Sequence, residues 1–169
     1  MRNLKLQING GARVAADRIE REIEIDAPID VVWAVITEPE HITGWFTDTA
    51  ELEVRPGAEG RFGWDVKATH RTVEVNLRVE RLEPPHLFSF RWNYPDGEEP
   101  TEANAPLVEF RLEARGGSTR LRLVESGLNA IARSDEAKET YFAEHSSGWA
   151  TIVERLRDYA PKQRSSVAG

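Results

Sequence analysis

SDEAKETYFAEHSSGWATIVERLRDY, residues 134–159, is the longest stretch of this sequence with helical periodicity. Its large side chains recur every three or four residues, which places them on one face of an α-helix. That face carries Phe142, His145, Trp149, Ile152, Val153 and Leu156. The pattern predicts one long C-terminal helix from about Ser134 to Tyr159, whose apolar face must be covered by another element.

The chain before this helix alternates between apolar and polar residues, as half-buried strands do. Strands are predicted over 18–26, 50–54, 61–66, 71–82, 87–92, 107–114 and 119–126. Short turns such as "RPGAEG" and "RGGS" connect strands, so consecutive strands should pair antiparallel. Only the last helix is long enough to cover such a sheet. The sequence therefore predicts an α+β helix-grip fold, in which a curved antiparallel sheet of six to seven strands wraps around a long C-terminal helix.

Two short helices are expected after the first strand. In "APIDVVWAVI", Pro28 suits a first helical turn and Asp30 suits the positive end of the helix. Pro39 ends this helix and starts a short second one through His41. The predicted organisation is an N-terminal extension over 1–17, one helix-grip domain over 18–160 and a disordered polar tail over 161–169. Within the extension, "NLKLQI" followed by "NGG" fits either a hairpin or a loose segment.

Composition excludes several classes of protein. The 169 residues carry a net charge of −7, and nucleic-acid binding would need a basic face instead. No apolar run approaches the roughly 20 residues of a membrane span, and the first ten residues lack the apolar core of a signal peptide. There are no cysteines, which excludes a disulfide scaffold, a thiol nucleophile and cysteine-ligated zinc. These features fit a cytoplasmic protein.

No motif identifies a catalytic centre. The four histidines, His41, His70, His86 and His145, do not stand in a metal-binding spacing. The nucleophile elbow, the P-loop and the dinucleotide fingerprint are all absent. We therefore assign no catalytic residue, no metal and no cofactor from sequence.

Five segments together resemble a known superfamily. They are "EIEIDAPIDVVWAVITEPEHITGWF", "RPGAEGRFGWD", "VERLEPPHLFSFRW", "STRLRLVESG" and "GWATIVERLRDY". Their order and spacing resemble the START-like (SRPBCC) superfamily, and more closely the branch of homologues of the activator of the Hsp90 ATPase. The resemblance runs from about Arg18 to Tyr159 and implies a cavity between the sheet and the long helix. It does not settle activity, because the superfamily includes lipid carriers, hormone receptors and polyketide cyclases.

Alternation predicts an aromatic wall for such a cavity. The strands contribute Phe62, Trp64, Val75, Leu77, Phe88, Phe90, Trp92, Val108 and Phe110, and the helix contributes Phe142, His145 and Trp149. Two polar residues also fall on apolar faces. Arg21 either points inward, where it needs an anionic partner, or reaches solvent at a strand edge. His145 is either a hydrogen-bonded core histidine or a catalytic base, and in a binding site it would supply the polar contact that orients the ligand.

The stretch "HITGWFTDTA", residues 41–50, places Trp45 and Phe46 side by side outside any obvious element. Two interpretations stay open. The pair fills the core beneath a loop, or it narrows the entrance of the cavity that the family resemblance implies.

Three functions follow from these patterns. The first is binding of a small hydrophobic, aromatic ligand at the cavity residues above, together with Arg21, Trp45 and Phe46. The second is a polyketide cyclase or aromatase, in which His145, Arg21 and Asp65 could assist proton transfer. The third is a chaperone-interacting module. It is disfavoured because the family name comes from one domain of larger activator proteins, whereas a single helix-grip domain is expected here. A homodimer is left open.

Overall fold

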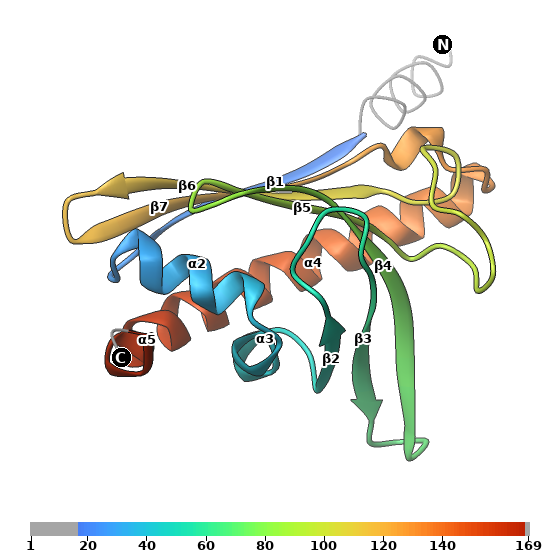
Figure 1. Cartoon of the computed structure of the whole chain (residues 1–169). Coiled ribbons are helices and arrows are strands. Elements are labelled where there is room, and N and C mark those ends of the chain that lie inside the picture. Colours follow the sequence, from blue (N-terminus) through green and yellow to red (C-terminus); the bar gives the residue numbers. More distant parts are fainter. Residues whose placement is uncertain (1–16, 168–169) are drawn as a thin grey trace, which may run out of the picture.

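The computed structural model describes residues 17–167, and their strands form one antiparallel sheet (Figure 1). Its seven strands follow the order β1-β7-β6-β5-β4-β3-β2. The strands are β1 (Arg18–Ile25), β2 (Thr49–Leu52), β3 (Glu59–Val66), β4 (Arg71–Glu83), β5 (Leu87–Trp92), β6 (Leu107–Arg115) and β7 (Ser118–Ser126). Six neighbouring pairs are antiparallel, and β1 joins the sheet beside β7. The predicted sheet is confirmed.

Helix α4 (Asp135–Tyr159) lies across one face of this sheet (Figure 1). It begins where the Ser134 side chain accepts a hydrogen bond from the amide of Ala137, at 3.2 Å. Trp149, Val153 and Leu156 are its buried residues. The sheet and this helix together confirm the predicted helix-grip fold.

Helices α2 (Ile29–Thr37) and α3 (Pro39–Trp45) follow β1 and lie on the same side of the sheet as α4 (Figure 1). The predicted second helix is longer than expected, because it continues past His41 to Trp45. Gly44 makes this continuation close-packed, since its backbone lies against the ring of Tyr159 at the end of α4.

The C-terminal segment corrects the predicted disordered tail. The 3-10 helix η2 (Ala160–Gln163) and helix α5 (Arg164–Val167) follow α4 directly. Ala160 is fully buried, Val167 packs against the core, and Arg164 donates to the side chain of Asp26 at 3.1 Å. The polar residues of this segment form no apolar pattern, so the sequence did not predict these contacts. The predicted N-terminal hairpin or loose segment lies outside the described residues.

The centre of the space between sheet and α4 is filled by side chains. Phe88, Phe90 and Phe110 are each fully buried and have ring centroids 5.5–6.4 Å apart. By contrast, the β3–β4 hairpin projects beyond the helix (Figure 1), and Val73 on this hairpin is 51% exposed. Of the helices between residues 17 and 167, none combines the length and hydrophobicity that a membrane span requires.

Candidate functional site

An apolar pocket of about 290 Å³ opens beside α4, near the point where the loop after α3 meets β3. Its wall includes residues from β3, β4, β5, that loop and one side of α4. The lining residues are Phe46, Trp64, Val75, Trp92, Asn93, Glu144, His145, Gly148, Trp149 and Ile152. This volume is just below the range of about 300–1,000 Å³ that is usual for ligand pockets. The pocket therefore suits a small ligand.

Phe46 is the centre of the aromatic wall. Its ring centroid lies 5.5 Å from that of Trp64 and 5.2 Å from that of Trp149. The loop that carries Phe46 is fastened to β3, because the Trp64 indole donates to the carbonyl of Phe46 at 2.9 Å. Edge-to-face and tilted rings at these distances attract one another beyond the burial of their surface. The wall is thus preformed.

A buried carboxylate lies behind this wall. Glu125 on β7 has 0% of its surface exposed. Its Oε1 accepts hydrogen bonds from the Trp92 indole at 2.9 Å and the Tyr141 hydroxyl at 2.7 Å. Its Oε2 accepts from the Trp149 indole at 2.8 Å and lies 3.0 Å from Nδ1 of His145. Four donors on two oxygens compensate for the loss of water around a carboxylate.

These contacts determine the protonation of Glu125. Burial raises the pKa of its carboxyl, but the hydrogen bond and charge of His145, with the bonds from Tyr141 and Trp149, outweigh burial and hold the pKa below its ordinary value. The carboxylate is therefore ionised at neutral pH.

Tyr141 and Asn93 support the carboxylate from one side. The side-chain amide of Asn93 donates to the Tyr141 hydroxyl at 2.9 Å, and that hydroxyl donates to Glu125. Burial, followed by the negative charge of Glu125, strongly raises the pKa of Tyr141, so the phenol stays a donor. Asn93 has a φ of 60°, a left-handed conformation that asparagine tolerates better than most residues.

His145 connects this network to the pocket. Its ring stacks on Tyr141 with centroids 3.6 Å apart, and its side chain keeps 21% of its surface exposed. Since Nδ1 contacts Glu125, a proton is favoured on Nδ1 and a lone pair on Nε2 in the neutral ring. Within residues 17–167, Nε2 has no hydrogen-bond partner. It is the ring nitrogen available to a bound molecule.

Gly148 lies about one turn after His145, on the side of α4 that lines the pocket. It lies inside α4, where glycine costs roughly 1 kcal/mol relative to alanine. A Cβ added to Gly148 would meet no atom within 4 Å. Packing within the protein therefore does not explain the glycine, and its effect is to leave open space over the helix.

The structure brings five of the twelve predicted ligand-binding residues to this pocket, namely Phe46, Trp64, Trp92, His145 and Trp149. The others lie elsewhere. Trp45, Leu77, Phe88, Phe90 and Phe110 belong to the buried core, and Phe142 packs at its border. The predicted cavity wall is thus largely core, and the pocket lies at its edge.

Arg21 also lies apart from the pocket. Its guanidinium donates to the Ser146 carbonyl at 2.7 Å and to the Ser146 hydroxyl at 3.0 Å. The residue is half-buried against α4, so it needs no anionic ligand. Asp65, considered for proton transfer, is exposed on β3 and accepts from Thr72 at 2.7 Å.

Sequence reasoning missed Glu125, Tyr141, Asn93 and Gly148. Glu125 had a usable signal, because it continues the inward alternation of Leu121 and Leu123 on β7. A glutamate at an inward position predicts a partnered, functional carboxylate. Gly148 also had one, since it is the only glycine inside the predicted helix.

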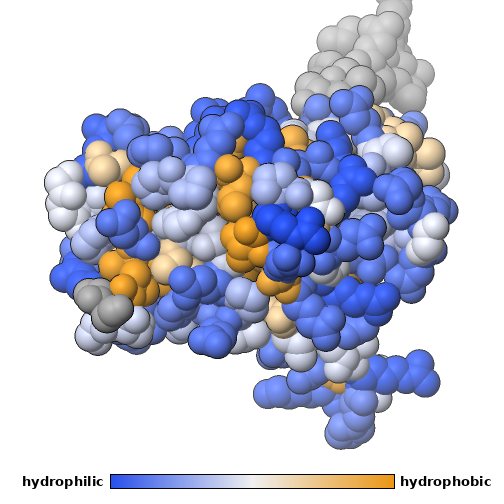
Figure 2. All heavy atoms as spheres, in the orientation of Figure 1, coloured by the Kyte–Doolittle hydropathy of each residue, from blue (hydrophilic) through white to orange (hydrophobic). Residues whose placement is uncertain are grey.

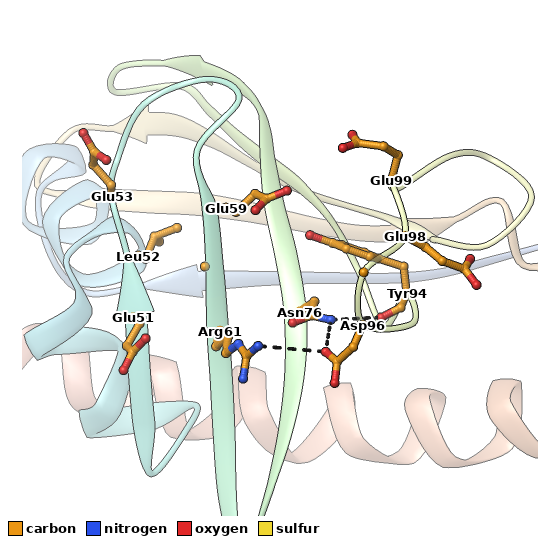
Figure 3. Close-up of a pocket in the computed structure, with 12 residues that line it drawn as sticks. Glu51, Leu52, Glu53, Glu59, Arg61, Asn76, Tyr94, Asp96, Glu98 and Glu99 are labelled. Atoms are coloured by element: carbon orange, nitrogen blue, oxygen red, sulfur yellow. Dashed lines mark hydrogen bonds and ion pairs between the residues drawn. The ribbon is translucent and has the colours of Figure 1, made fainter.

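A second and larger opening lies between β2, β3, β4 and the segment after β5 (Figure 3). This groove of about 560 Å³ contains six acidic residues: Glu51, Glu53, Glu59, Asp96, Glu98 and Glu99. Arginines pair with several of them, as Arg78 does with Glu99 at 3.0 Å. Across residues 17–167, no three or more His, Cys, Asp or Glu side chains are placed to hold a metal ion. We assign the groove no ligand.

The sheet wrapped around α4, with an apolar pocket beside the helix, defines a START-like helix-grip domain. A family comparison agrees. The chain belongs to the family of activator of Hsp90 ATPase homolog 1-like proteins, whose model matches residues 26–160. A comparison with curated proteins finds no match.

Solved structures share the fold at low identity. DynU16, from the dynemicin biosynthetic locus, is 23% identical with a TM-score of 0.67, covering 88% of this chain and 48% of DynU16. This chain thus spans about half the length of DynU16. NE0264 from Nitrosomonas europaea is 14% identical with a TM-score of 0.73, covering 89% of this chain and 98% of its own. The Aha1 dimer from Colwellia psychrerythraea is 18% identical with a TM-score of 0.62, covering 83% and 93%. Identities this low establish the fold alone.

Proposed function

We propose that this protein binds a small hydrophobic, aromatic ligand in the pocket beside α4. The observation that carries the proposal is the open space over Gly148, kept inside a helix at a cost in stability and bordered by the aromatic wall. A ligand bound in this space would account for a glycine that lowers the stability of the helix.

The lining defines the ligand's chemistry. Phe46, Trp64, Trp92 and Trp149 offer ring faces and edges for offset stacking with a flat molecule. Neither lysine nor arginine lines the pocket, whereas Glu144 borders it and ionised Glu125 lies behind it. Arg155 lines the adjoining opening over Gly148, but the lining beside His145 contains no cation, so a neutral ligand fits this pocket best. Nε2 of His145 supplies the polar contact that sets its orientation.

The surface favours a small molecule over a chaperone partner. On the face in Figure 2, hydrophobic atoms form small separate patches among hydrophilic ones. Val66 and Val73 are the large hydrophobic residues exposed within residues 17–167, and both lie on the β3–β4 hairpin. A protein-docking surface would present a broader apolar patch.

A homodimer stays a prediction for this chain. One structural neighbour, Aha1 from C. psychrerythraea, was solved as a dimer. Light scattering during size-exclusion chromatography measures the mass directly, and a mass of twice 19.1 kDa would support a homodimer.

The binding proposal is tested by titrating the protein with N-phenyl-1-naphthylamine, a neutral aromatic dye that fluoresces in apolar surroundings. We expect saturable binding with a micromolar Kd. In Gly148→Leu the new side chain occupies the open space, so the dye should bind at least about tenfold more weakly. The same variant should be more stable by up to about 1 kcal/mol, because leucine is a better helix former than glycine.

Gly117→Leu is the matched control, since Gly117 also has nothing within 4 Å of an added Cβ but lies in the turn before β7. It should bind the dye as the wild type does. Absence of saturable binding in the wild type, or equal binding by Gly148→Leu, would overturn the proposed function.

A further inference from the structure

The proposed function leaves one feature of the pocket unexplained. Binding of a neutral aromatic ligand does not require a buried carboxylate, and an apolar residue at position 125 would avoid burying a charge. Instead Glu125 is fully buried, and both of its oxygens are occupied by donors. One of its neighbours, His145, also borders the pocket.

We propose that His145 and Glu125 form a general-base pair that removes a proton from a neutral, flat substrate bound in this pocket. The inference rests on the proposed function, because the substrate would occupy the ligand site. The substrate class is an aromatic or conjugated carbonyl compound with an acidic C–H or O–H group, held with that group at Nε2 of His145.

The division of roles follows from the hydrogen bonds. The contact of Nδ1 with Oε2 at 3.0 Å orients the ring, so His145 is the catalytic residue and Glu125 is a positioning residue. When Nε2 takes up a proton, the imidazolium charge forms beside the carboxylate. The Tyr141 and tryptophan donors keep that carboxylate ionised, so a fixed negative group compensates the new charge.

The other groups around the imidazole are consistent with this role. From α4, Tyr141 stacks on it and Glu144 lies at the pocket edge; from β5, the Trp92 ring lies 5.5 Å away, edge to face. Arg133 lies on Tyr141, with its Cζ 5.6 Å from that ring centroid. The groups in direct contact with the imidazole are therefore neutral or acidic, and Glu125 is the charged group hydrogen-bonded to it.

The test uses 5-nitrobenzisoxazole, a neutral flat compound that reports a base in an apolar pocket. Nε2 of His145 takes the proton from C3, the C–H electrons form the nitrile, and the N–O bond breaks to leave a coloured phenolate. The imidazolium then releases its proton to water. We expect saturable turnover about 10²–10⁴-fold above the buffer rate, the range of general-base catalysis. The naphthylamine dye should inhibit it competitively.

His145→Gln keeps an amide donor for Glu125 but has no base, so its rate should fall to the buffer rate while the dye still binds. His86→Gln, at an exposed histidine that does not line the pocket, is the matched control and should keep the wild-type rate. An undiminished rate in His145→Gln would overturn the proposal. Displacement of the dye by 5-nitrobenzisoxazole without turnover would also overturn the general-base proposal, but it would leave the binding proposal intact. No dye binding at all would overturn both the binding proposal and the general-base proposal.

Two variants test the role of Glu125 through the pH–rate profile, which a purely structural role would not move. Glu125→Gln removes the charge and should shift the midpoint to lower pH. Tyr141→Phe removes a donor from Oε1, leaves the carboxylate less compensated and should shift the midpoint to higher pH. This second variant decides the question if Glu125→Gln does not fold. An unmoved midpoint in the folded variants would show that Glu125 does not act on His145.

Discussion

The ring of Tyr159, the last residue of α4, lies directly against the backbone of Gly44 in α3. A Cβ added to Gly44 would overlap the Tyr159 ring. The Tyr159 hydroxyl also lies 3.0 Å from Nδ1 of His41, one turn earlier in α3. This contact holds α3, and the loop that carries Phe46, against the long helix.

Gly44→Ala should therefore destabilise the protein by about 1–3 kcal/mol, the usual cost of overpacking. Urea unfolding measures the change. Gly117→Ala, in a turn with no atom near the added Cβ, should change the free energy of unfolding by less than about 0.5 kcal/mol. The double variant Gly44→Ala with Tyr159→Ala should recover part of the loss; strict additivity would show that the two residues do not meet.

Trp45 and Phe46 should separate stability from binding. Trp45 is 3% exposed, and its indole donates to the Val35 carbonyl at 3.0 Å, but it does not line the pocket. Trp45→Phe should thus cost about 1–3 kcal/mol of stability and leave dye binding unchanged. Phe46→Leu is smaller and loses the ring contacts of Phe46, so it should cost a similar amount of stability and, unlike Trp45→Phe, should also weaken dye binding. Weaker dye binding by Trp45→Phe than by Phe46→Leu would mean that Trp45, and not Phe46, belongs to the binding site.

Tyr141→Phe should show how much the hydrogen bond from Tyr141 to Glu125 contributes to the free energy of unfolding. It removes the hydroxyl that donates at 2.7 Å to the buried carboxylate, and hydrogen bonds to charged groups contribute about 1.5–3 kcal/mol. Thermal and urea unfolding should show a loss in that range. Tyr94→Phe, at another buried tyrosine, is the control and should change stability little. Equal effects in both variants would contradict a special role for the Glu125 contact.

Acid should destabilise the protein through Glu125. Because its folded-state pKa lies below the ordinary value of 4.5, the unfolded chain takes up a proton first as the pH falls. The contribution of Glu125 to the free energy of unfolding is thus complete at pH values above the ordinary pKa of a glutamate. It is lost as the pH falls through the folded-state pKa, at up to about 1.4 kcal/mol per pH unit for one proton.

Urea unfolding between pH 7 and pH 3 measures this slope. Tyr141→Phe should flatten it, because losing that hydrogen bond lets the folded-state pKa rise towards its ordinary value. Glu53→Gln should keep the slope, although Arg55 lowers the pKa of Glu53, because that carboxyl is exposed and screened by solvent. If Tyr141→Phe keeps the wild-type pH dependence of the free energy of unfolding, Glu125 is not the cause of that dependence.

Local periodicity was sufficient to predict the seven strands and the long helix of this fold. Leu87–Trp92 was predicted with the bounds that the structure has, and the helix predicted from Ser134 begins with Ser134 as its cap. Segments that depend on distant contacts were predicted less well. The helical turns after Tyr159 form because Ala160 and Val167 reach the core, which the polar sequence around them does not indicate.

The sequence by itself determined which side chains face the helix, because alternation along a strand is a property of neighbouring residues. Only the tertiary structure decided which of them pack the core and which border a pocket. Phe90 and Trp92 share one strand face, yet only Trp92 reaches the pocket, since Phe46 and Gly148 shape that edge from other elements. The pairing of Glu125 with His145 likewise requires β7 and α4 to pack together, and the spacing of two residues along a chain does not specify how two elements pack.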